Sequence, residues 1–162
     1  MYRASDIARY IIERCKEKDR PISNLKLQKI LYFVQAEFLA AKGQPCFAEA
    51  IEAWDFGPVV PCVYYEYRMY GGANIPCMGK SGVHRLISAE DREILNGIID
   101  ECSRYAASML VEITHNQTPW KEAYRKGGYN NVITVESIKN YFGEDYKKCP
   151  RLKSELTKQP EK

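Results

Sequence analysis

The chain has 162 residues, of which 45% are hydrophobic and 28% are charged. This size and composition are those of a single globular domain, and they exclude the disordered and fibrous classes of protein. The formal net charge is only +3, and its 24 basic and 21 acidic residues are interspersed. A protein that binds nucleic acid usually gathers its basic residues on one face or in one run, so this pattern argues against nucleic acid as a partner.

The six cysteines are scattered, without a C-x-x-C pair or a nearby histidine. Zinc ligands usually come in closely spaced pairs, so we expect no metal site and no cofactor. Cys15 and Cys102 fall on the apolar faces of expected helices, where a reduced thiol behaves as a small hydrophobic group. The amino-terminal sequence lacks the apolar run of a signal peptide, and no stretch is long enough to span a bilayer. We therefore expect a cytoplasmic protein without membrane contact.

Two helices are expected in the first part of the chain. Ser5 is a good N-cap for the first helix, which places Ile7 and Ile11 on one side. Ser23 caps a second helix, which should end at Gly43 because glycine readily takes the left-handed conformation after a helix. The middle of this second helix, "KILYFVQAEFLAA", is apolar on nearly all sides. Such a pattern predicts a buried helix at the centre of the fold.

The stretch "QPCFAEAIEAWDFGPVVP" is rich in aromatic and branched residues and partly alternating. It predicts a short β-hairpin or extended segment around residues 46–57, with a turn near Ala48 or Glu49. Gly57 precedes a proline and can adopt backbone angles that other residues avoid. This corner leads into a third helix, from about Pro61 to Tyr70, which stops at two glycines.

The second half of the chain is expected to be helical after a glycine-rich loop with a short extended piece at "GVHRLIS". Ser88 and Asp91 form a capping box before an apolar stripe, and a shorter helix carries "SMLVEITH". Thr118 should cap the next helix, and Thr134 the last one. The predicted fold is mainly α: a single helical domain over residues 3–149, followed by a charged, flexible tail over residues 150–162. Lys147–Lys153 is the densest basic stretch, and we interpret it as part of a solvated end.

Three stretches carry a resemblance when they are taken together: "LKLQKILYFVQAEFLAAKGQPCF", "IEAWDFGPVVPCVYYEYRMYG" and "LVEITHNQTPWKEA". Their order and spacing resemble the Panacea domain, also called the SocA-like antitoxin domain, which occurs in bacterial, phage and other mobile-element genes. The resemblance runs from about Ile7 to Phe142. The matching positions are Trp54, Gly57, Pro58, Val59, Val60, Pro61, His115, Pro119 and Trp120.

The resemblance implies a largely helical antitoxin that neutralises a cognate protein toxin by direct binding. A second possibility is an adaptor that delivers the toxin or another client to a cytoplasmic protease, with the tail from Pro150 engaging that protease. A third possibility is an enzyme that acts on a small molecule, but this would need a polar pocket that the sequence does not reveal. The chain departs from the family at Cys62 and at Tyr64-Tyr65, where relatives are more polar.

The aromatic residues of the corner allow two interpretations. In an extended strand Trp54 and Phe56 would share one side and Asp55 would point the other way. Indoles are usually buried, which favours a core position for Trp54; an exposed anchor for a partner is the alternative. Tyr65 lies off the apolar stripe of the third helix and is the better candidate for exposure.

His115 invites a catalytic interpretation because imidazole titrates near neutral pH. No nucleophile motif such as G-x-S-x-G accompanies it, so we expect no enzymatic activity. We interpret His115 instead as a helix-end residue whose ring bonds to backbone or stacks on Trp120. The predicted partner-binding or motif residues are therefore Trp54, Phe56, Gly57, Pro58, Val59, Tyr65, His115, Pro119 and Trp120.

Overall fold

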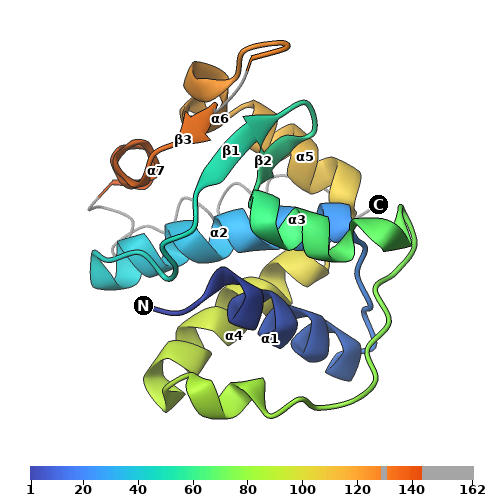
Figure 1. Ribbon diagram of the computed structural model, residues 1–162. Coiled ribbons are helices and arrows are strands. Elements are labelled where there is room, and N and C mark those ends of the chain that lie inside the picture. Colours follow the sequence, from blue (N-terminus) through green and yellow to red (C-terminus); the bar gives the residue numbers. More distant parts are fainter. Residues whose placement is uncertain (129–130, 144–162) are drawn as a thin grey trace.

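Helix α2, Asn24–Lys42, runs through the middle of the protein in the computed structural model, which describes residues 1–128 and 131–143. Figure 1 shows α1, Ala4–Glu17, and α4, Ala89–Ser103, on one side of α2, and a small sheet on the other. Three further helices lie on the side of the sheet: α5 (Ala107–His115), α6 (Thr118–Ala123) and α7 (Val135–Phe142). The prediction of a mainly α domain is confirmed. The expected tail over residues 150–162 and the basic stretch Lys147–Lys153 lie outside the described residues.

Local capping signals determine both ends of α2. The Ser23 side chain accepts a hydrogen bond from the Lys26 amide at 3.3 Å, and Gly43 ends the helix with φ of 72°. Every residue from Leu27 to Ala36 is buried, because other elements pack on the helix from several sides. The predictions of the two caps and of a central buried helix are confirmed.

The predicted start of α1 is wrong by two residues. The helix begins at Ala4, and Arg3 at the cap position makes no side-chain bond to it. The Ala4 amide instead donates to the Glu49 carboxylate at 3.0 Å, so a residue from a distant loop satisfies this helix end. A carboxylate is favourable there because the helix dipole is positive at the amino terminus.

The sheet has three antiparallel strands in the order β2-β1-β3. The strands are β1 (Ile51–Trp54), β2 (Gly57–Val59) and β3 (Val132–Ile133). The hairpin of β1 and β2 turns at Asp55 and Phe56, so the prediction of a turn near Ala48 or Glu49 is wrong. The register pairs Trp54 with Gly57, whose φ of 102° is one that glycine adopts readily and other residues rarely adopt.

The remaining helices follow the predicted order, with local differences. Helix α3, Pro61–Tyr67, continues as a 3₁₀ turn over Arg68–Tyr70. The segment expected to be extended contains another 3₁₀ turn, Val83–Leu86. Ser88 and Thr134 cap α4 and α7 as predicted. Thr118 does not cap α6: Gln117 takes the cap position without a side-chain hydrogen bond to the helix, and Thr118 is the first helical residue.

Reduced thiols contribute to the core. Cys15 and Cys102 are buried on α1 and α4, as predicted, and all the cysteines that the structure describes are free. Burial raises the pKa of Cys15 to about 11 and that of Cys46 to about 12, because a thiolate is poorly solvated away from water. These thiols therefore act as small apolar side chains rather than as nucleophiles.

Candidate partner-binding site

Buried polar side chains of α2 hold the Gly57-Pro58 corner. The Lys29 ammonium donates to the Pro58 carbonyl oxygen at 2.7 Å, and the Gln28 side chain accepts from the Val60 amide at 2.9 Å. Gln28 in turn receives support from Asn24, whose side-chain oxygen accepts a bond at 2.9 Å. The motif "LKLQKILYF" therefore supplies both apolar packing and the hydrogen bonds of the corner.

Gly57 is required by the close approach of the corner to this helix. Its φ is 102°, a backbone angle that residues other than glycine rarely adopt. A Cβ atom there would lie 2.8 Å from both Lys29 Cε and Thr114 Oγ1. Lys29 is itself fully buried, and burial lowers its pKa to about 7. The corner is thus built on a glycine without room for a side chain and on a lysine without contact with water.

A stack of three rings supports the other side of the hairpin turn. His115 lies 4.1 Å from Trp120 between ring centroids, and Trp120 stacks on Tyr124 at 4.6 Å. Trp120 Nε1 donates to the Trp54 carbonyl oxygen at 2.9 Å, and His115 Nε2 lies 3.0 Å from the carbonyl oxygen of Asp55. The prediction that His115 bonds to backbone and stacks on Trp120 is confirmed. These contacts fix the turn as a rigid unit.

Tyr124 also stabilises the hairpin turn, through a hydrogen bond to the carboxylate of Asp55. Its hydroxyl donates to that carboxylate, and this hydrogen bond raises the pKa of Tyr124. Pro119 is buried at the start of α6, where its ring fits the first helical turn. The "HNQTPW" segment therefore positions three rings against the turn.

Trp54 is half-buried and lies outside the core, so the expectation of a core position is wrong. Along β1 it is Ile51 and Ala53 that face the core, while Glu52 and Trp54 point away. The indole makes edge contacts with Tyr64 at 4.9 Å and with Tyr65 at 6.2 Å, and its Nε1 donates to Glu52 at 2.8 Å. The expected alternation of Trp54, Asp55 and Phe56 also fails, because the strand ends at Trp54 and the turn follows.

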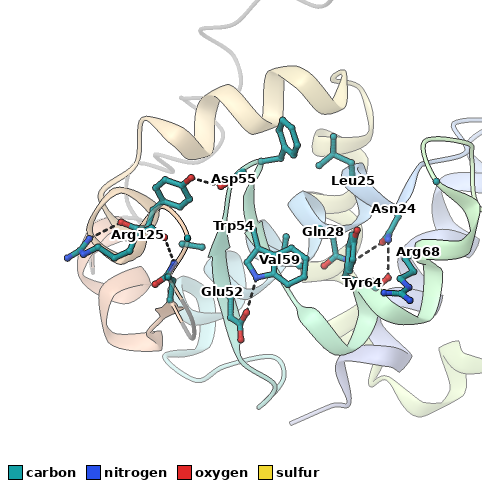
Figure 2. Close-up of a pocket in the computed structure, with 17 residues that line it drawn as sticks. Asn24, Leu25, Gln28, Glu52, Trp54, Asp55, Val59, Tyr64, Arg68 and Arg125 are labelled. Atoms are coloured by element: carbon teal, nitrogen blue, oxygen red, sulfur yellow. Dashed lines mark hydrogen bonds between the residues drawn. The ribbon is translucent and has the colours of Figure 1, made fainter.

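A groove of about 600 Å³ lies over the outer face of the hairpin; we call it the corner groove. Figure 2 shows Trp54 near its middle, with Tyr64 and Arg68 on one side and Arg125 on the other. Leu25 and Phe56 also line it. Phe56, at the tip of the turn, is 69% exposed, and Tyr65, which contacts Trp54, is 56% exposed as predicted.

The predicted residues thus meet around one hairpin: some of them form its corner, and the others support the turn or border the groove. Gly57, Pro58 and Val59 are buried and form the corner itself. Side chains that line the groove but were not predicted come from four separated segments, and they include Asn24, Leu25, Glu52, Arg68, Tyr124 and Arg125. One sequence signal could have indicated the buried hydrogen bonds of the corner. Asn24 and Gln28 are polar residues one helical turn apart, beside the apolar stretch of α2.

Comparison with known proteins identifies the family. The family described as "Antitoxin SocA-like, Panacea domain" matches residues 27–121, which include most of α2, the corner and most of α6. The chain belongs to this family. It is also 38% identical over 127 residues to Antitoxin SocA of Caulobacter vibrioides (strain NA1000 / CB15N). These aligned residues cover 72% of this chain and 68% of the relative. No solved structure matches the chain.

The matched region contains most of the residues that line the corner groove; Asn24 and Leu25 lie before it, and the lining residues from Tyr124 onward lie after it. No helix within the described residues is both long enough and apolar enough to cross a membrane. No group of three or more metal-ligating side chains occurs in residues 1–128 and 131–143.

Proposed function

We propose that this protein is an antitoxin that neutralises a protein toxin by binding it directly, and that the corner groove and its rim are the contact surface. The family match and the resemblance to Antitoxin SocA support the antitoxin role. The exposed side chains of Phe56 and Tyr65 support the location of the surface, because large apolar groups that stay in water on a folded protein often contact a partner.

The observation that carries the proposal is the exposure of Phe56 on a rigid turn. The turn is held by Trp120 and His115 on one side, and the corner behind it is held by Lys29. A side chain presented on a fixed backbone loses little conformational entropy when it binds, so more of the contact energy appears as affinity. Aromatic residues supply much of the binding energy at protein interfaces for this reason.

We infer a non-enzymatic role in the cytoplasm. His115, the residue with the most suitable chemistry for catalysis near the groove, uses Nε2 on the Asp55 carbonyl and one ring face on Trp120. Those contacts are structural and leave the ring poorly placed to act as a general base. The free cysteines, including the exposed Cys62, agree with a reducing compartment.

Co-expression with each reading frame that flanks the gene tests the proposal. We expect one neighbour to stop growth, and we expect the tagged antitoxin to restore growth and to purify with that neighbour at a fixed ratio. Phe56→Ser should abolish both, while its melting temperature stays unchanged because the side chain is 69% exposed. Leu86→Ser is the matched control, since Leu86 is 61% exposed on the 3₁₀ turn Val83–Leu86, away from the groove.

The proposal fails if no neighbour is toxic, or if Phe56→Ser neutralises and binds as well as the unaltered protein. Restored growth accompanied by disappearance of the toxin would instead identify an adaptor for a cytoplasmic protease. Loss of function in Leu86→Ser as well as in Phe56→Ser would place the contact surface elsewhere.

A further inference from the structure

The geometry points to one class of ligand for the corner groove: a linear segment of the partner protein with a large apolar side chain at its centre and an acidic residue on each side. The apolar side chain contacts Trp54, and the two acidic residues contact Arg68 and Arg125. This inference rests on the proposed function, because it describes what the toxin would present to the groove.

The two arginines of the groove are the first argument. Both are exposed, and no ion pair between described residues includes either of them. Arg68 lies over the Tyr65 ring, 5.5 Å from its centroid, and among the described residues Arg125 donates only to the carbonyl oxygens of Glu122 and Tyr124. Each guanidinium keeps donors available, and a carboxylate is the partner that matches this fork of donors.

The acidic residues of the groove occupy a different position. Glu52 and Asp55 belong to the hairpin, between Arg68 and Arg125 (Figure 2). Glu52 accepts from the Trp54 indole, and Asp55 accepts from the Tyr124 hydroxyl, so internal donors already bind both carboxylates. The charge along the groove is therefore positive at the ends and negative in the middle. A ligand with acidic ends and an uncharged centre is complementary to this pattern.

The apolar centre of the ligand follows from the side chains near Trp54. Tyr64 contacts the indole, and Leu25 and Phe56 line the same groove with 37% and 69% of their surface exposed. The apolar surface continues beyond the cavity to Tyr65, which contacts Trp54 and is 56% exposed. A contact surface that extends past the cavity fits a segment of a larger protein better than an enclosed small molecule.

Selection from a display library of random linear peptides on the purified full-length protein tests the inference. We expect the selected peptides to share a large apolar residue flanked on both sides by Asp or Glu, with no acidic residue next to the apolar one. The double variant Arg68→Glu/Arg125→Glu should weaken binding of a synthesised winner by about tenfold or more. Arg85→Glu, on the exposed 3₁₀ turn Val83–Leu86, should change it less than about twofold.

The same selection on the double variant should enrich Lys or Arg at the flanking positions. Peptides without flanking acids, an equal loss of binding in Arg85→Glu, or no selected peptide at all would overturn the inference. The proposed function fails separately. If a toxic neighbour is still neutralised through Phe56 but the arginine variants bind and neutralise normally, the antitoxin role stands and only the acidic ligand is wrong.

Discussion

Lys29 offers the sharpest test of how the corner is held. Its side chain is fully buried on α2, and its ammonium donates to the Pro58 carbonyl oxygen at 2.7 Å. Burial alone lowers the pKa from 10.5 to about 7, since no carboxylate offsets the loss of water. A fall of this size corresponds to about 5 kcal/mol of unfavourable free energy for keeping the charged lysine in the native state.

The sign of the pH dependence follows from the two pKa values. Between pH 7 and pH 10.5 the unfolded chain keeps the proton on Lys29, whereas the native protein releases it. The unfolded state therefore binds more protons, and the free energy of unfolding rises with pH across this window by up to ~1.4 kcal/mol per pH unit. Below pH 7 both states are charged, and the full penalty remains.

The variant Lys29→Met removes this contribution. The lost hydrogen bond to Pro58 adds a cost of ~1–3 kcal/mol at every pH, so we compare differences between pH values rather than single stabilities. At low pH the variant avoids the penalty of the buried charge. Its free energy of unfolding, relative to that of the unaltered protein, should therefore fall by ~2–3 kcal/mol between about pH 6 and pH 9. The raised pKa values of Cys15 and Tyr67 also affect stability at high pH, but they act equally in both proteins and cancel.

Urea denaturation at a series of pH values, followed by circular dichroism, measures this difference. Lys16→Met, which removes an exposed lysine of α1, is the control and should change stability little at any pH. A difference between Lys29→Met and the unaltered protein that stays constant from about pH 6 to pH 9 would refute a buried lysine that releases its proton near neutrality.

Three further substitutions test the corner and its supports. Gly57→Ala should lower the free energy of urea unfolding by ~2–4 kcal/mol, against ~1 kcal/mol for Gly43→Ala, because both have positive φ but only Gly57 has atoms 2.8 Å from a new Cβ. Equal losses would disprove the close approach. His115→Ala should cost ~1 kcal/mol in the same assay by removing a hydrogen bond and a ring contact, and no loss would show that the stack does not support the turn. Trp54→Ala should cost only ~1 kcal/mol, as expected for a half-buried ring, yet weaken toxin binding by ~2 kcal/mol in calorimetric titration; a loss of ~4 kcal/mol in stability would restore the core interpretation.

Predictions from the sequence succeeded where the determining interactions are local. Ser23 and Thr134 cap their helices through bonds to amides three residues away, and Gly43 ends α2 through its own backbone angles. His115 was also predicted correctly, because its partner Trp120 is only five residues further along the chain. Each of these features depends on residues within about two helical turns.

Predictions failed where a distant residue decides the outcome. The first turn of α1 depends on Glu49, and β1 pairs with β3 some eighty residues later. Trp54 faces outward because Ile51 and Ala53 take the core side of β1, which the sequence does not reveal until the position of the turn is known. Whether the Trp54 side chain faces the core or the solvent therefore depends on the register of the hairpin.

By itself the sequence determined the helical class of the domain, the buried central helix and the family motif, because periodicity, caps and turn residues act over short distances. Only the tertiary structure decided the corner groove. It brings Arg68, Trp54 and Arg125 together from three segments and buries Lys29 against Pro58. Contacts of this kind depend on how separate elements pack, and no local pattern in the chain encodes the distance between them.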